Sequence, residues 1–324
     1  MNKPVFHKGI LTITDPEETV NCIVTELKNN THNILKRYGG VVGISGGIDS
    51  SVTLALSARA FGPEKVLGIM LPEKDSSSES EILAIKLVNK FRVKAITENI
   101  SDALTGFDCY KRRDQAVKNV FPEYDPSTHK MKIGIKTAPQ SMLPPVFSVV
   151  IIDADGNEQS KKLPAKEYMQ IVAASNFKQR ARMSMLYYHA ERLHYAVIGT
   201  PNKHEVEQGF FVKYGDGGAD IMPIGHLYKT QVYQLARFLG IPKEIIERTP
   251  TTDTYSAEQT QEEFFYQFPF ETMDLLWYAY ENHYEPGEVG DIMGYSADEI
   301  NHFYENFKRK QLTTEYLRMS PIKI

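Results

Sequence analysis

The sequence lacks the features that mark secreted, membrane-spanning and disulfide-rich proteins. It has only two cysteines, Cys22 and Cys109, too few for a disulfide framework or a structural zinc site. No apolar run approaches the roughly 18 to 20 residues that a membrane-spanning helix needs. The first residues, MNKPVFHKGILTITDPEE, contain no apolar stretch typical of a signal peptide. These absences predict a cytoplasmic protein with no membrane partner.

An excess of positive charge is also missing. The chain has 37 basic and 41 acidic residues, which gives a formal net charge of −4. Because duplex nucleic acid is bound through a basic surface, we expect no nucleic-acid partner. The 21 glycines and 17 prolines among 324 residues are ordinary for a globular protein, so collagen-like and wholly disordered chains are excluded.

The chain alternates between short apolar segments and amphipathic segments. Strands are expected at 40–44, 66–71, 93–97 and 195–198, and helices at 16–37, 52–60, 78–91, 165–192, 228–239 and 270–312. This alternation predicts an α/β protein with a doubly wound parallel sheet and helices on both faces. We expect residues 1–324 to form a single domain.

Residues 108–163 interrupt this rhythm and are predicted to be an insertion within the domain. They contain five prolines, and their two apolar or alternating segments, 146–152 and 159–163, could pair as a hairpin around Asp153-Ala154-Asp155-Gly156. About 56 residues are too few for a robust core of their own but enough for a flap or interface element.

The first expected strand leads directly into a loop suited to phosphate. Its glycines let backbone N–H groups approach an anion, and the next helix presents its positive end. A bare carboxylate at Asp49 would repel phosphate unless it holds Mg²⁺. The spacing differs from G-x-x-x-x-G-K-[ST], so hydrolysis of a γ-phosphate is not implied. The predicted phosphate-binding residues are Gly43, Ser45, Gly46, Gly47, Asp49 and Ser50.

A second group of motifs lies between residues 176 and 231. It comprises Asn-Phe-Lys-Gln-Arg-Ala-Arg-Met at 176–183, Gly-Thr-Pro-Asn-Lys-His-Glu at 199–205, Lys-Tyr-Gly-Asp-Gly-Gly-Ala-Asp at 213–220 and Pro-Ile-Gly-His-Leu-Tyr-Lys-Thr-Gln at 223–231. The phosphate loop resembles that of the N-type ATP pyrophosphatases. The second group, in this order, resembles the NAD synthetase family in its short form without a glutaminase domain.

The resemblance implies a reaction in two steps. ATP adenylates the nicotinate carboxylate of deamido-NAD⁺ and releases pyrophosphate, and NH₃ then displaces AMP to give NAD⁺. Such a ligase depends on positioning and on charge neutralisation. ATP is thus the expected co-substrate and Mg²⁺ the expected cofactor, with Asp49 and Glu205 as metal ligands.

The resemblance also assigns roles residue by residue. Lys229, Thr200 and Thr251 are expected to contact ATP. Asp49, Lys229 and Asp216 are the candidate catalytic residues. The deamido-NAD⁺ ligands are expected to be Arg180, Lys213 and Asp220, and the insertion at 108–163 is expected to shape this acid site.

Several positions depart from the family pattern. Tyr316-Leu317 stands where the family commonly has His-Lys, and Arg318 follows it. His226 replaces a usual Asp and Pro201 a frequent Gly. These differences leave open an AMP-forming amide ligase that acts on a different carboxylic acid. A nucleotide-binding regulator without catalysis is disfavoured by intact Asp49, Glu205 and Lys229, and tRNA modification is disfavoured by the net charge.

The partners follow from the same comparison. About 39 residues precede the first expected strand, far fewer than an amidase domain needs, so free ammonia is the expected nucleophile unless a separate glutaminase delivers it. A homodimer is expected, because related enzymes are dimers and because the helix at 16–37 carries an apolar stripe that needs a partner.

Overall fold

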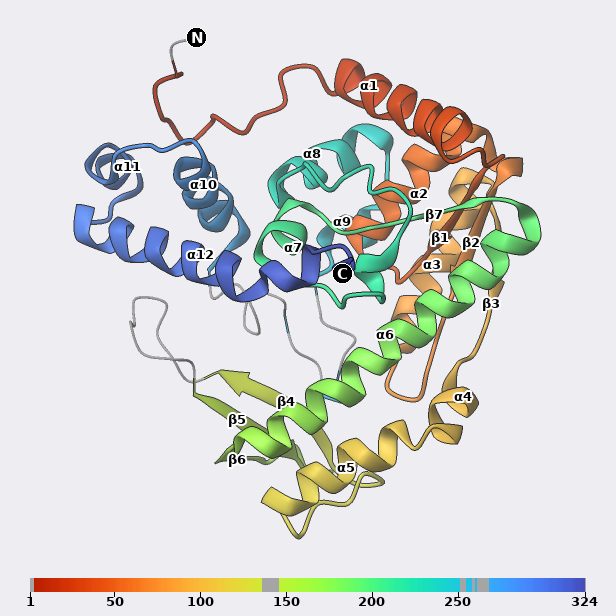
Figure 1. The fold of residues 1–324 in the computed structure, drawn as a ribbon, viewed down its shortest axis with the longest axis vertical. Coiled ribbons are helices and arrows are strands. Elements are labelled where there is room, and N and C mark those ends of the chain that lie inside the picture. Colours follow the sequence, from red (N-terminus) through yellow and green to blue (C-terminus); the bar gives the residue numbers. More distant parts are fainter. Residues whose placement is uncertain (1–2, 136–145, 251–254, 258–259, 261–267, 324) are drawn as a thin grey trace.

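Four parallel strands form the central sheet. The structure, a computed structural model, describes residues 3–135, 146–250, 255–257, 260 and 268–323. The strands pair in the order β3-β2-β1-β7, all parallel, which confirms the predicted sheet (Figure 1). Their bounds are β1 (Gly40–Gly43), β2 (Val66–Met70), β3 (Lys94–Thr97) and β7 (Ala196–Ile198).

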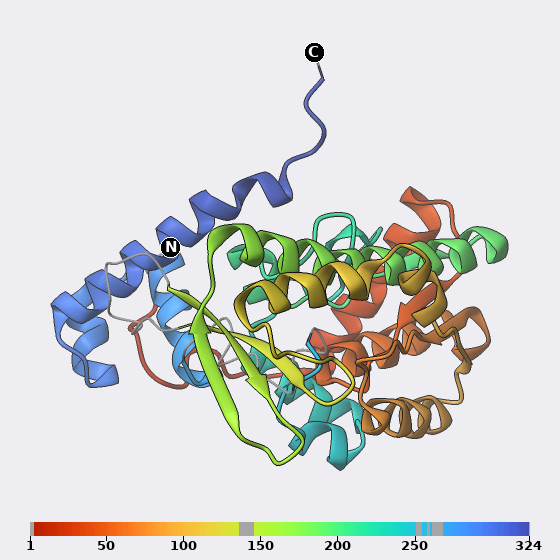
Figure 2. The same cartoon turned by 90° about the horizontal axis from the view of Figure 1, so that it is seen from below.

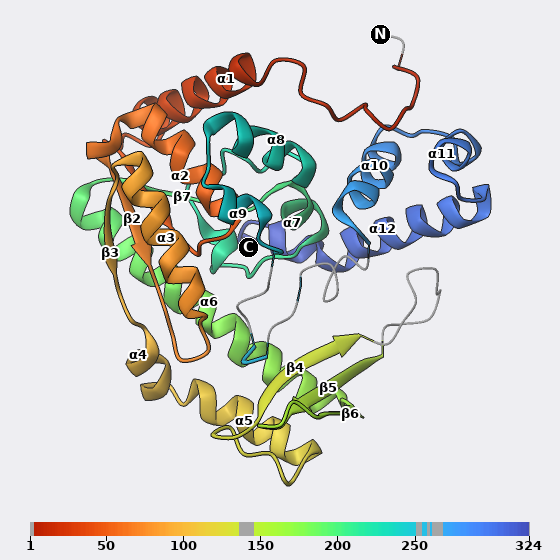
Figure 3. The ribbon, with the colours of Figure 1, turned by 180° about the vertical axis from the view of Figure 1, so that it is seen from behind.

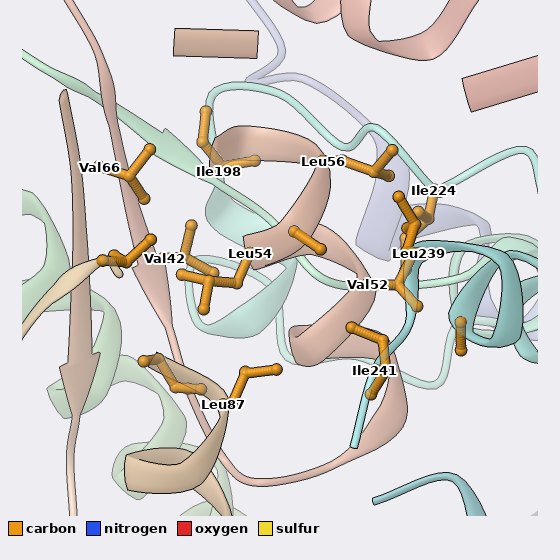
Figure 4. Packing of buried hydrophobic residues seen from close by; sticks show 14 of the residues in the cluster. Val42, Val52, Leu54, Leu56, Val66, Leu87, Ile198, Ile224, Leu239 and Ile241 are labelled. Carbon is orange, nitrogen blue, oxygen red and sulfur yellow. The ribbon is translucent and has the colours of Figure 1, made fainter. Parts of the chain in front are cut away.

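Successive strand residues point to opposite faces, and each face is covered by helices. Val42 and Val66 pack into one buried cluster, whereas Val41 and Leu67 pack into another (Figure 4). The first cluster is closed by α1 (Pro16–Asn29), α2 (Ile48–Phe61), α3 (Ser78–Phe91), α8 (Lys229–Leu239) and α9 (Lys243–Glu247). The second is closed by α4 (Ser101–Gly106), α5 (Cys109–Val120) and α6 (Ala165–Leu193).

A second, antiparallel sheet lies away from the first. Its strands, β4 (Lys130–Ile135), β5 (Phe147–Ile152) and β6 (Glu158–Lys162), pair in the order β4-β5-β6. The expected hairpin is present as β5 and β6. The inner face of this sheet is apolar and packs on α5 and α6, which run side by side (Figure 2). The elements β4, α4 and α5 were not predicted from the sequence.

The C-terminal region contains three helices rather than the one expected at 270–312. These are α10 (Phe270–Glu281), α11 (Pro286–Met293) and α12 (Ala297–Arg318), which pack around Trp277 and Phe303 (Figure 3). Pro286 starts a new helix, because it lacks the N–H that a continuing helix needs. Gly294, with φ at +82°, ends that helix. Short α7 (Lys203–Gln208) was also missed.

The helix expected at 16–37 is shorter. Asp15 caps it by accepting a hydrogen bond from the N–H of Glu18 at 2.9 Å, as expected. It ends at Asn29, and one π-helical turn continues to Ile34. Short 3-10 turns lie at Pro63–Lys65 and Asp216–Gly218.

The apolar stripe of α1 needs no second subunit. Val20, Ile23 and Leu27 are buried in the chain's own core, where α1 packs on α2 and α8. The expectation that this stripe requires a partner was therefore wrong. Among the helices of the described ranges, none has the length and apolar character to cross a membrane.

Candidate active site

The phosphate loop connects β1 to the first turn of α2. Gly46 has φ at +72°, and a Cβ there would lie 2.6 Å from the carbonyl oxygen of Ser80. Only glycine therefore fits without strain. Gly47 is the N-cap of α2 and offers no side chain to its first N–H groups. Ser45 and Ser50 hydrogen-bond within the loop, so their hydroxyls face the same small space. The arrangement is suited to an anion.

A pocket of about 120 Å³ opens beside this loop. It is lined by six of the residues that the sequence predicted, together with Ile48 and with Ile245, Arg248, Thr249 and Pro250 at and after α9. The six are Ser45, Gly47, Asp49, Ser50, Thr200 and Glu205. Thr251, which follows Pro250, lies outside the described residues. The ends of β1 and β7 thus converge on one cavity, as expected at the carboxyl edge of a parallel sheet.

Asp49 and Lys229 meet beside this pocket. The Nζ of Lys229 donates a hydrogen bond to Oδ2 of Asp49, and the Lys229 side chain is fully buried. Burial alone would lower the pKa of Lys229, but the nearby carboxylates of Asp49 and Glu205 outweigh it and raise that pKa. The ammonium therefore stays charged beside the pocket.

Asn202 is a functional residue that the sequence interpretation missed. Its Nδ2 donates to the other carboxylate oxygen of Asp49 at 3.2 Å. Its Oδ1 also accepts from the N–H of Glu205, while the Glu205 carboxylate accepts from the Asn202 N–H at 2.8 Å. This is a capping box at the start of α7. The Asn-x-x-Glu spacing at 202–205 was the available signal.

Glu205 shares the pocket with Asp49. Burial raises the pKa of the Glu205 carboxyl, and the negative charge of Asp49 raises it further. Two carboxylates with this repulsion are a natural place for a cation. No cluster of three or more His, Cys, Asp or Glu side chains suited to a metal occurs in the described ranges. Two carboxylates next to a phosphate site are nevertheless the donor set that Mg²⁺ commonly uses.

Asp216 lies outside the pocket lining and supports its own loop. Its Oδ1 accepts a hydrogen bond from the N–H of Val212 at 2.7 Å. Burial raises the pKa of the Asp216 carboxyl to about 6. A Cβ on Gly217 would lie 2.1 Å from the ring of Phe211, so this tight turn requires glycine.

The three residues expected to bind the acid are not among those that line this pocket. Arg180 is exposed on α6, and its Nε donates to the carbonyl oxygen of Lys213 at 3.1 Å, so these two residues are neighbours. Asp220 follows β7 and accepts hydrogen bonds from the N–H of Val197 and the hydroxyl of Tyr187. The structure brings Arg180 and Lys213 together and places Asp220 separately.

The C-terminal end of α12 reaches the same region. The Lys213 ammonium donates to the carbonyl oxygens of Tyr316 and Met319 at 2.8 and 2.7 Å. Arg318 donates to the carbonyl oxygens of Val206 and Glu207 at the end of α7. Tyr316, one of the residues that depart from the family pattern, thus contacts the candidate acid ligand Lys213.

A buried ionic cluster next to α6 had no sequence signal. Lys178 donates to Glu73 at 2.9 Å and to Asp75 at 2.6 Å, and Arg113 of α5 also pairs with Asp75. Burial would raise the pKa of Asp75, but these two cations outweigh it and lower that pKa. The cluster joins the loop after β2 to α5 and to the helix that carries Arg180.

Comparisons with known proteins identify the family of the chain. The family model described as NAD synthase matches residues 19–123 and 146–316. An NH(3)-dependent NAD(+) synthetase of Rhizobium meliloti is 43% identical over 320 residues, which is 99% of this chain and 95% of the relative. One of Methanocaldococcus jannaschii is 31% identical and covers 91% of this chain and 93% of its own length.

Solved structures show the same fold. An NMN synthetase from Francisella tularensis superposes with a TM-score of 0.64 at 21% identity, covering 96% of this chain and 99% of its own. An NH3-dependent NAD synthetase from Campylobacter jejuni gives a TM-score of 0.61 at 21% identity, covering 96% and 100%. The family match and the closely covering relatives together show that this chain belongs to the NAD synthase family.

Proposed function

We propose that the chain is an ammonia-dependent NAD⁺ synthetase, a carbon–nitrogen ligase that releases AMP and pyrophosphate. The observation that carries this proposal is the pocket in which the phosphate loop, Asp49, Glu205 and Lys229 meet. Incubation with ATP, Mg²⁺, NH₄⁺ and deamido-NAD⁺, followed by chromatography, tests it. NAD⁺ and AMP in equal amounts support the proposal, and an absence of both overturns it.

ATP binds with its phosphates on the loop at 45–47 and the start of α2. Lys229 neutralises phosphate charge, and Thr200 supplies a hydroxyl contact. Asp49 and Glu205 hold Mg²⁺, which offsets the negative charge of the polyphosphate when it is bound. Thr251 is proposed as a further hydroxyl contact to ATP.

The acid substrate binds next to this pocket, held by Arg180, Lys213 and Asp220. A nicotinate carboxylate oxygen attacks the α-phosphorus of ATP, and pyrophosphate leaves with the bonding electron pair. The nitrogen of NH₃ then attacks the acyl carbon, AMP leaves, and the nitrogen loses a proton. Asp216 keeps the loop that carries Lys213 and Asp220 in its turn, and we retain it as a catalytic candidate on that ground.

A different carboxylic acid is the second candidate. The neutral Tyr316-Leu317 pair lies beside Lys213, where the family has a positive charge, and it favours an acid that carries less phosphate. Nicotinate mononucleotide is a suitable comparison, because it shares the nicotinate carboxylate but has a single phosphate. The ratio of kcat/KM for the two acids decides between the candidates.

We propose a cytoplasmic homodimer that uses free ammonia, or ammonia from a separate glutaminase. Met169 and Tyr188 are 64% and 58% exposed on α6, the helix that carries Arg180, and such side chains suit a subunit contact. Light scattering at micromolar concentration tests the dimer. A monomeric mass with full activity contradicts it.

Residues 108–163 are proposed to be an insertion that shapes the acid site within a single domain. α5 packs along α6, and Arg113 joins the ionic cluster of Lys178. The insertion also reaches the segment that follows the ATP pocket. The N–H of Met131 in β4 donates to the hydroxyl of Ser256, and the N–H of Ala257 donates to the Met131 carbonyl.

A further inference from the structure

Asp274 of α10 lies between two helices that carry residues of the proposed active site. Its side chain is fully buried, and both of its carboxylate oxygens are used. Oδ1 accepts a hydrogen bond from Nε2 of His204 at 2.5 Å. Oδ2 accepts from the backbone N–H of Thr230 at 2.7 Å. A single carboxylate from the C-terminal helices therefore holds the start of α7 and the start of α8.

These two helix starts supply groups that meet at Asp49. Asn202 and Glu205 belong to the capping box of α7, and Lys229 is the first residue of α8. His204 and Thr230 are their immediate neighbours in the chain. Because Asn202 and Lys229 both bind Asp49, a shift of one helix against the other would separate them. Asp274 fixes that relative position without lining the pocket itself.

In the chain of hydrogen bonds that ends at Asp274, each group donates to the next. The ammonium of Lys310 donates to Oε1 of Gln208 at 3.3 Å, and Nε2 of Gln208 donates to Nδ1 of His204 at 3.1 Å. His204 can then carry its proton only on Nε2, where it donates to Asp274. His204 and Gln208 are also fully buried, so a reversed link would leave a polar group unpaired.

We propose that Asp274 is a positioning residue of the ligase reaction, and this inference rests on the proposed function. Through His204 and the Thr230 N–H it sets Glu205 and Lys229 in the geometry that adenylation needs. Misplacement of about 1 Å at a reacting centre can cost about a hundredfold in rate. The phosphate loop has no hydrogen bond with Asp274 among the described contacts, and the attraction between the Lys229 charge and a phosphate changes little over a shift of about 1 Å. ATP binding should therefore change much less than turnover.

The test is Asp274→Asn, which keeps the shape but reverses the polarity of one oxygen. The new amide N–H would face the N–H of His204, and two donors cannot form a hydrogen bond with each other. We expect kcat to fall about 10- to 100-fold, while the dissociation constant of a non-hydrolysable ATP analogue changes less than about threefold.

The double variant Asp274→Asn with Gln208→Glu is the rescue. The carboxylate introduced by Gln208→Glu can accept a hydrogen bond from Nδ1 of His204, so the ring can move its proton to that nitrogen. Nε2 of His204 then accepts from the amide introduced by Asp274→Asn, and every link is satisfied again. We expect this pair to recover most of the lost kcat. Recovery of kcat supports the proposal that Asp274 acts through the direction of these hydrogen bonds. A double variant with a kcat no higher than that of Asp274→Asn overturns the proposal.

Leu276→Ala is the matched control, because Leu276 is fully buried on the same helix but lies outside the hydrogen-bonded chain. It should lower the unfolding temperature while kcat of the folded protein stays near wild type. Should Asp274→Asn not fold, His204→Phe keeps the ring and its edge contacts with Tyr228 and Trp277 and loses the N–H. A wild-type kcat in a folded Asp274→Asn or His204→Phe variant overturns the proposal.

The wild-type protein in the same assay separates this inference from the proposed function. No NAD⁺ from wild type means that the proposed function fails. Wild-type activity with unchanged variants means that only the positioning role fails.

Discussion

Asp49 and Lys229 are 180 residues apart in the sequence and form an ion pair at the first turns of two helices, α2 and α8. The Lys229 side chain is fully buried and that of Asp49 is 15% exposed, on the side of the pocket. Removing one partner would leave the other charge poorly compensated.

Asp49→Asn should abolish AMP release, and the protein should still fold at some cost in stability, because Glu205 stays near the buried ammonium of Lys229. The amide keeps the size of the side chain but loses the charge that binds Lys229 and that is proposed to bind Mg²⁺. We expect a fall in kcat of at least about 10²-fold, measured as AMP formed per minute. Asp102→Asn, in the exposed first turn of α4, is the control and should be unchanged. Wild-type turnover by the Asp49→Asn variant would contradict the proposal that Asp49 is a metal ligand.

Glu205 should make the ligand-free protein less stable as the pH rises. Its pKa in the folded protein is raised from 4.5 to about 8, so the folded state holds a proton that the unfolded state has lost. The stabilisation is complete below pH 4.5 and disappears as the pH rises through about 8. Urea unfolding without Mg²⁺ from pH 5 to 9 measures this.

Variants and added Mg²⁺ test whether Glu205 causes this pH dependence. Glu205→Gln should reduce the dependence between those limits and leave the part that comes from Asp216, whose pKa burial raises to about 6. Glu207→Gln on the same helix should leave the dependence unchanged. Millimolar Mg²⁺ should also reduce the dependence, because a bound cation favours the ionised carboxylate. The same slope in wild type and Glu205→Gln would show that another group is responsible.

Lys178→Met should destabilise the protein strongly. The substitution leaves Glu73 and Asp75 buried with less positive charge, a change that costs about 3–5 kcal/mol for a buried pair. The midpoint of urea unfolding measures the cost. Lys166→Met, exposed on the same helix, should change stability by less than about 0.5 kcal/mol. Equal effects of the two variants would mean that the ionic cluster contributes little.

Replacing residues 108–163 with a short Gly/Ser linker should raise the KM for deamido-NAD⁺ about tenfold or more, which corresponds to about 1.4 kcal/mol. The reason is that α6, which carries Arg180, loses its packing against α5. The KM for ATP should change much less. Shortening only the exposed turn at 153–157 is the control. Unchanged constants in the linker variant would make the segment a passive insertion.

If the KM for ATP changes more than the KM for deamido-NAD⁺, the insertion acts on the ATP pocket rather than on the acid site. The contact of Met131 with Ser256 and Ala257 would then be its main effect, because those residues follow Pro250 of the ATP pocket by only a few positions.

The central sheet and the phosphate loop could be predicted from the sequence because their signals are local. Each strand is a short apolar run, and the Ser-Gly-Gly-Ile-Asp-Ser loop lies directly between a strand and a helix. The roles of Arg180, Lys213 and Asp220 came from family resemblance and stay predictions. In the structure these three side chains form hydrogen bonds with protein atoms.

Other features depend on contacts between distant segments and had no local signal. The Lys178 cluster joins residues about 100 positions apart, and Asp274 binds residues 44 and 70 positions away. A sequence shows Asp274 only as one polar residue in an apolar helix. The apolar stripe of α1 led to an error of the opposite kind. It predicted a contact with a second subunit, whereas α2 and α8 of the same chain cover it.

The most direct measurement follows oxygen from the acid into AMP. Deamido-NAD⁺ labelled with ¹⁸O in the nicotinate carboxylate is incubated with ATP, Mg²⁺ and NH₄⁺, and the products are separated and weighed by mass spectrometry. If the carboxylate attacks the α-phosphorus, NAD⁺, pyrophosphate and AMP form in equal amounts, and each AMP carries one ¹⁸O. Formation of ADP, or of AMP without ¹⁸O alongside NAD⁺, would contradict adenylation at this site.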